Sequence, residues 1–71
     1  MAKYSTEKFE NTTTGQEILV YWRQDKHVHD ASMITSIKQW LGQNHGGTWD
    51  VRANSYQSNQ NEPTRGEEYS G

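Results

Sequence analysis

The sequence predicts a small α+β domain of order β-β-α-β, in which one helix packs on one face of a three-stranded, mostly antiparallel sheet. Three observations support this prediction: a dense apolar run in the first half, apolar residues at three- and four-residue spacing after Asp30, and a shift to polar composition after Tyr56. A chain of 71 residues has room for one domain. We assign this domain to residues 1–56 and a disordered acidic tail to residues 57–71.

The first segment, residues 3–10, is expected to be an edge strand. Tyr4 and Phe9 are its only large apolar residues, and Thr and charged residues lie between them. A short helical turn over residues 5–10 is the alternative. The polar loop 11–15 ends in Gly and has the length of a five-residue hairpin connection.

The strongest strand signal lies in residues 16–24, where β-branched and aromatic side chains follow one another. Side chains alternate between the two faces of a strand. We expect the helix side to receive Ile18, Val20 and Trp22, and the opposite side to receive Leu19, Tyr21 and Arg23. A run this apolar indicates the central or most buried strand.

An amphipathic helix of about 14 residues, roughly 21 Å long, is expected next. Asp30 is the expected N-cap, because its carboxylate can accept a hydrogen bond from a free amide of the first turn. Gly42 and the Gly46-Gly47 pair supply stop signals. The apolar stripe consists of Met33, Ile34, Ile37, Trp40 and Leu41.

Residues 48–56 are expected to form the third strand. Its apolar face would consist of Trp49, Val51 and Ala53, and its polar face of Asp50, Arg52, Asn54 and Tyr56. This alternation indicates a sheet with one covered face and one open face. The pattern does not determine which of the first two strands the third one flanks.

Composition and charge exclude several classes of protein. Without cysteine the chain has no disulfide framework, thiolate zinc site or cysteine nucleophile. No apolar run approaches the ~20 residues of a membrane span, so we expect a cytoplasmic protein without membrane contact. Residues 1–56 carry six basic and six acidic side chains, so the tail holds the whole net charge of −2. A neutral domain is a poor match for duplex DNA.

The sharpest local pattern is His27-Val28-His29. Two histidines two residues apart in an extended segment point the same way, and His45 or Asp30 could complete a metal site with them. A structural zinc site needs four ligands in defined spacing, so His27 and His29 are a weak metal candidate, and exposed loop histidines are the favoured interpretation. No catalytic motif is present, and we expect neither catalysis nor a cofactor.

The open sheet face is the expected site of function. Its residues are Leu19, Tyr21, Arg23, Arg52, Asn54 and Tyr56. Tyr and Arg are enriched at binding hot spots. We therefore expect a protein-binding module, such as a phage- or mobile-element-type inhibitor or adaptor of a host protein, which could also form a homo-oligomer. The alternatives are a single-stranded nucleic-acid-binding domain that stacks bases on its tyrosines, and a structural subunit of a larger assembly.

Overall fold

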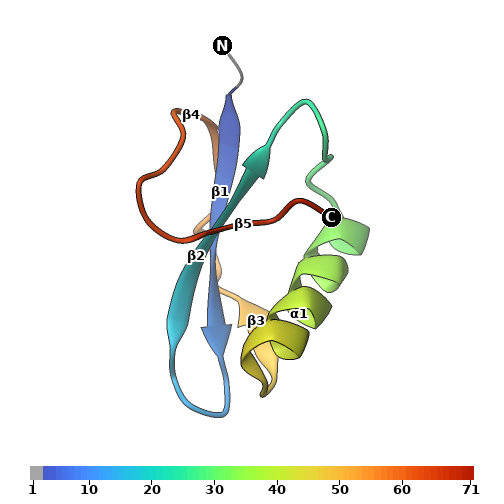
Figure 1. The fold of residues 1–71 in the computed structure, drawn as a ribbon, viewed down its shortest axis with the longest axis vertical. Coiled ribbons are helices and arrows are strands. Elements are labelled where there is room, and N and C mark those ends of the chain that lie inside the picture. The colour runs from blue at the N-terminus through green and yellow to red at the C-terminus, as the bar shows by residue number, and fades with distance from the viewer. Residues whose placement is uncertain (1–2) are drawn as a thin grey trace.

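The computed structural model describes residues 3–71, which form one helix and a mixed sheet of five strands (Figure 1). The elements are β1 (Tyr4–Asn11), β2 (Glu17–Arg23), α1 (Ala31–His45), β3 (Trp49–Val51), β4 (Gln57–Gln60) and β5 (Glu67–Glu68). The expected small α+β fold with a single helix is confirmed. The sheet was expected to have three strands and to be mostly antiparallel. The number of strands is wrong, because β4 and β5 follow; the pairings of β1 with β2, β3 and β4 are antiparallel, whereas β5 is parallel to β2.

The strand order is β3-β1-β2-β5, and β4 also pairs with β1. β1 and β2 form an antiparallel hairpin that is in register from Tyr4↔Arg23 to Glu10↔Glu17. β3 and β4 lie one after the other along the opposite edge of β1. The segment expected to be an edge strand is therefore an inner strand, with hydrogen-bonded partners on both sides.

β1 occupies this inner position despite its polar sequence. Ser5, Thr6, Glu7 and Asn11 are all buried, and each forms a side-chain hydrogen bond or pairs through its backbone. Buried polar groups are tolerated when they are hydrogen-bonded. The polar composition that indicated an edge strand instead marks a strand whose side chains bond to surrounding loops.

The helix begins and ends at the predicted signals. Asp30 is the N-cap, and its Oδ1 accepts a hydrogen bond of 2.8 Å from the amide of Met33. Gly46 follows the last helical residue with φ at 74°, and its amide donates to the carbonyl of Gly42. Glycine adopts this left-handed backbone without the steric cost that a side chain would add.

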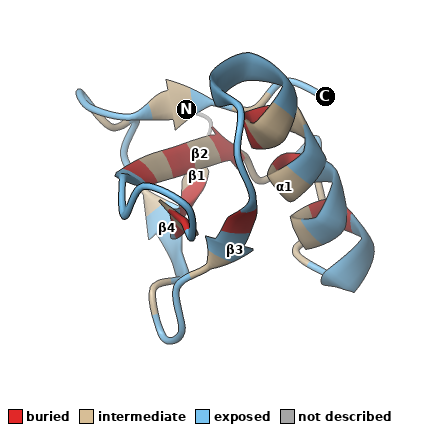
Figure 2. Cartoon of the chain, turned by 90° about the horizontal axis from the view of Figure 1, so that it is seen from below, coloured by how far each residue is buried: buried red, intermediate tan, exposed pale blue. Residues whose placement is uncertain are grey.

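The core lies between α1 and one face of the sheet, where the buried segments of both face each other (Figure 2). It contains Phe9, Ile18, Val20, Trp22, Met33, Ile37, Leu41 and Trp49. The helix-facing assignment of the second strand is therefore confirmed. At roughly 25 cal/mol per Å² of apolar surface, such a cluster is the main source of stability.

β3 is shorter than expected because the chain turns after Val51. Asn54 has φ at 60°, so residues 53–54 form a turn and Ala53 is exposed, outside the core in which we expected it. Ser55 then replaces part of the missing strand. Its Oγ accepts a hydrogen bond of 3.1 Å from the amide of Lys8, at the point of β1 between its β3 and β4 partners.

The prediction of a disordered tail over residues 57–71 is wrong. β4 pairs with β1, and β5 pairs with β2 at Val20↔Glu67 and Tyr21↔Glu68. Tyr69 follows: its amide donates to the Tyr21 carbonyl at 2.8 Å, and its ring lies edge-on to Trp40 at 5.3 Å. The chain therefore returns across the edge of β2 and ends beside the start of α1 (Figure 1).

Candidate interaction surface

The face of the sheet opposite α1, which we call the outer face, is built from alternate residues of β1 and β2. The register pairs Tyr4 with Arg23, Thr6 with Tyr21 and Lys8 with Leu19. Their neighbours along each strand point into the core, so these six side chains point away from the helix. Loops from the second half of the chain surround this face.

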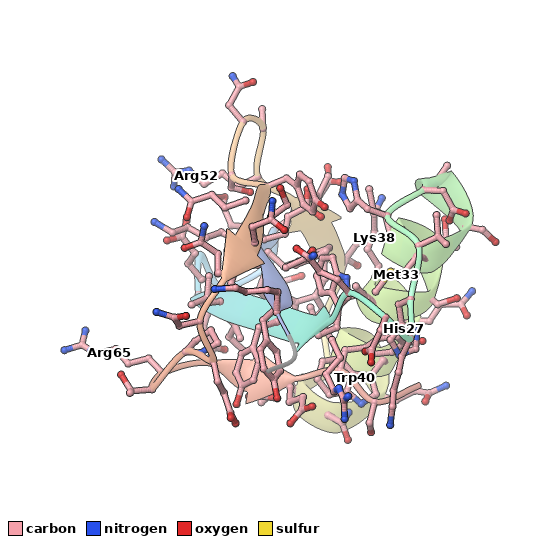
Figure 3. The ribbon with its side chains drawn as sticks, turned by 90° about the horizontal axis from the view of Figure 1, so that it is seen from above. His27, Met33, Lys38, Trp40, Arg52 and Arg65 are labelled. Atoms are coloured by element: carbon pink, nitrogen blue, oxygen red, sulfur yellow. The ribbon has the colours of Figure 1, made fainter. Side chains whose placement is uncertain are left out.

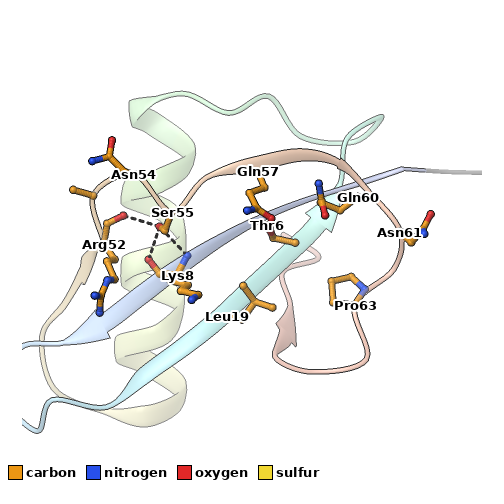
Figure 4. A pocket seen from close by; sticks show the side chains of 11 residues that line it. Thr6, Lys8, Leu19, Arg52, Asn54, Ser55, Gln57, Gln60, Asn61 and Pro63 are labelled. Carbon is orange, nitrogen blue, oxygen red and sulfur yellow. Dashed lines mark hydrogen bonds between the residues drawn. The ribbon is translucent and has the colours of Figure 1, made fainter.

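One hollow of about 480 Å³ lies on the outer face, over Thr6, Lys8 and Leu19 (Figure 4). Its rim is formed by Arg52, Ala53, Asn54, Ser55, Gln57, Gln60, Asn61 and Pro63. The turn after β3 is fixed against the floor, because the Ser55 hydroxyl bonds both to the Lys8 amide and, at 2.6 Å, to the Arg52 carbonyl. The hollow therefore has one wall held by hydrogen bonds to β1.

A second hollow of about 480 Å³ adjoins the first and shares Lys8 and Leu19 with it. Its other lining residues are Gln16, Glu17, Ile18, Arg65, Gly66 and Glu67. The two hollows meet over the Lys8↔Leu19 cross-strand pair. Together they form a groove across β1 and β2, which we call the outer groove.

The charge of the outer groove is positive. Three basic side chains line it, Lys8, Arg52 and Arg65, against two acidic ones, Glu17 and Glu67. Arg52 forms an ion pair with Glu17 at 2.7 Å, and Glu67 pairs with His45 at the end of α1. Within residues 3–71, no ion pair involves Lys8 or Arg65. Figure 3 shows Arg52 and Arg65 on the side away from the helix.

The structure brings three of the six predicted site residues together in the groove: Leu19, Arg52 and Asn54. Tyr21 and Arg23 lie on the outer face but do not line the groove. The ring of Tyr21 lies edge-on to that of Tyr4 at 5.8 Å, and Arg23 bonds to a neighbouring aspartate at 2.9 Å.

Tyr56 is on the opposite side, so its expected place on the outer face is wrong. Its ring stacks on His29, with 3.7 Å between centroids, and on the core residue Trp22 at 6.3 Å. Its hydroxyl lies 3.2 Å from the Ser5 hydroxyl. The turn at Asn54 interrupts the strand alternation, and the chain re-enters the sheet with its faces exchanged.

Sequence reasoning missed Lys8 and Arg65, the two basic residues of the groove that form no ion pair within the described residues. Alternation within residues 3–10 places Lys8 opposite to Phe9, and this signal could have identified it. Arg65 stands in a polar segment without periodicity, so no local pattern indicates its position.

The histidines expected to form a pair have different neighbours. His27 lies against Tyr69 with 5.2 Å between ring centroids, whereas His29 Nε2 lies 3.0 Å from Glu7 Oε1. In the described part of the chain, no three His, Cys, Asp or Glu side chains are placed to hold a metal ion. The two-histidine motif is thus divided between two separate contacts.

The pKa values of Tyr4 and Tyr21 are raised above their usual value. Burial is the largest cause for both phenols, and the nearby carboxylates Glu62 and Glu68 add to it. Both rings therefore remain neutral at physiological pH and act as apolar and hydrogen-bonding surfaces.

No family model, curated protein or solved structure matches this chain. Among the described helical residues, no helix is long and apolar enough to cross a membrane. The groove over Lys8 and Leu19 is therefore a candidate on its own geometry and charge.

Proposed function

We propose that this chain is a non-enzymatic protein-binding module whose outer groove receives part of another protein. One observation supports the proposal above all: two hollows of about 480 Å³ meet over Lys8 and Leu19, on the face that α1 leaves open. Binding sites are concave and combine an apolar floor with a few placed polar groups. Here the half-buried Leu19 is the apolar element and the basic side chains are the polar ones.

The rim suits recognition of a peptide backbone. Asn54, Gln57, Gln60 and Asn61 present amide groups around the first hollow, and each amide can both donate and accept hydrogen bonds. The described lining contains no histidine, and its two carboxylates, Glu17 and Glu67, each pair with a basic group. This composition favours binding over acid–base catalysis.

An inhibitor or adaptor role, of the kind that small accessory proteins of phages and mobile elements have, is one form that such binding can take. The neutral rather than basic composition favours a protein partner over nucleic acid. The base-stacking alternative required Tyr21 and Tyr56 on one face, and these rings lie on opposite faces.

Site-specific photo-crosslinking tests the proposal. A photoreactive side chain at Leu19 is expected to capture a partner protein from cells that express the chain. The matched control carries the same group at Gln39, which is exposed on α1. Capture of the same proteins from both positions, or of none from Leu19, would overturn the proposal.

A further inference from the structure

β2 is paired along only part of its outer edge. β5 pairs with it at Val20 and Tyr21, and no strand of the described chain lies beside residues 17–19. The second hollow lies beside this stretch, between Gln16–Leu19 and Arg65–Glu67. The edge is therefore next to open space.

The hydrogen-bond phase shows which backbone groups reach this edge. The Asn11 amide donates to the Gln16 carbonyl, and the Gln24 amide donates to the Lys3 carbonyl. The backbone N–H and C=O groups of the even-numbered residues therefore point toward β1. The backbone N–H and C=O groups of the odd-numbered residues point away from β1, as the hydrogen bond from the Tyr69 amide to the Tyr21 carbonyl shows. The amides of Glu17 and Leu19 thus point to the open edge.

These outward groups have no partner within residues 3–71. No hydrogen bond there uses the amide of Glu17 or Leu19 or the carbonyl of Glu17. The last segment reaches this edge at Gly66, where φ is 92° and the backbone lies close to the Leu19 carbonyl, and it pairs with β2 only from Glu67 on. An unpaired strand edge is a template on which another extended chain can pair.

The positive charges beside the open edge of β2 favour one kind of binding partner over another. Lys8 lies across from Leu19 in the register, Arg65 lies beside the same hollow, and neither forms an ion pair in the described chain. A second copy of this protein would bring further lysine and arginine to the same place. Like charges in a shared interface repel, whereas carboxylates would be attracted.

We propose that the occupant is an extended acidic segment of the partner protein, which adds to the sheet as a strand beside Glu17–Leu19 and places carboxylates near Lys8 and Arg65. This inference rests on the proposed function and deepens it. Backbone pairing supplies the geometry, and the positive charges of Lys8 and Arg65 supply the preference for acidic side chains.

The test uses a short end-blocked peptide of alternating Thr and Glu on the full chain. Amide hydrogen exchange followed by NMR is expected to slow about tenfold or more at Glu17 and Leu19, since each gains a hydrogen bond. Two matched probes, one with Lys in place of Glu and one with alternate backbone amides methylated, are expected to bind about tenfold more weakly. No protection by the acidic peptide at millimolar concentration, or equal binding of the methylated peptide, would overturn the inference.

A charge-reversed variant keeps the test independent of folding. Lys8→Glu with Arg65→Glu changes two exposed side chains and is expected to exchange the preference, so that the Lys peptide binds better than the Glu peptide. An unchanged preference contradicts the role of these cations. Protection of Glu17 and Leu19 that increases with protein concentration, without peptide, would show a second copy as occupant and overturn the inference.

The outcome is separable from that of the proposed function. Leu19 can capture a partner while the Glu17 and Leu19 amides exchange at their free rates in the complex. In that case the protein-binding function stands and strand addition is wrong. If Leu19 captures nothing, the proposed function fails first.

Discussion

The Nε2 atom of His29 lies 3.0 Å from Oε1 of Glu7, a buried carboxylate on the helix side of β1. This is the only hydrogen bond or ion pair of that carboxylate within residues 3–71. The imidazole is held by stacking on Tyr56. This contact connects the loop before α1 with β1, an inner strand of the sheet.

Loss of this contact is expected to destabilise the fold. His29→Ala leaves the Glu7 carboxylate buried without a partner, and we expect the free energy of unfolding to fall by about 2 kcal/mol. Urea unfolding measures this change. His27→Ala is the matched control and is expected to cost less than about 1 kcal/mol, because that ring lies against Tyr69 and forms no hydrogen bond within residues 3–71. Equal losses for the two variants would contradict the account.

Gly66 allows the C-terminal segment to dock on β2. A Cβ at this position would lie 2.1 Å from the Leu19 carbonyl oxygen, so Gly66→Ala is expected to detach β5 and to speed exchange of the Tyr69 amide. The control is Gly15→Ala, where φ is also positive at 80° but nothing lies within 4 Å. The control should cost about 1 kcal/mol of conformational strain and leave Tyr69 protected. A protected Tyr69 amide in both variants would show that the close approach does not matter.

The C-terminal segment is expected to be part of the folded structure. Removing residues 57–71 deletes β4, β5 and the packing of Tyr69 on Trp40, so the thermal midpoint should fall sharply or the cooperative transition should disappear. Tyr69→Ala is the milder change and should cost about 1–3 kcal/mol, since the ring is half-buried. Circular dichroism during heating measures both. An unchanged midpoint after truncation would mean that this segment adds nothing to stability.

The raised pKa of Tyr21 makes stability depend on alkaline pH. Its folded pKa lies above the unfolded value of about 10, so the stabilising contribution is present below that pH and is lost as the pH rises through the folded pKa. Burial is the main cause and Glu68 the next, so Glu68→Gln is expected to lower the pKa. NMR titration of the Tyr21 ring measures it. Glu10→Gln, which removes a carboxylate that does not act on this phenol, should leave the pKa unchanged.

The predictable part of the fold is the part with strong periodicity. The helix between Asp30 and Gly46 and the strand centred on Val20 combine a regular apolar pattern with clear end signals, and both were found where expected. The third strand could not be bounded this way. Its alternation continues in the sequence beyond Val51, and only the left-handed backbone of Asn54 ends it.

The C-terminal segment escaped prediction for a different reason. Its strands are held by backbone pairing with β1 and β2 and by the single ring of Tyr69, and neither contributes to an apolar count. The candidate site also has a part that the sequence predicts and a part that it does not. Leu19 follows from alternation along β2, whereas Arg65 reaches the groove only because the last segment folds back.

The central claim is that the outer groove binds a partner protein. The most direct test compares the affinity of that partner for two variants of the chain. The partner captured through Leu19 is titrated against Lys8→Glu and against Lys26→Glu, two exposed positions with the same change of charge. Lys8 is in the groove and Lys26 is outside it. The account predicts that Lys8→Glu weakens binding about tenfold or more while Lys26→Glu changes it less than about twofold. Equal affinities for the two variants would contradict it.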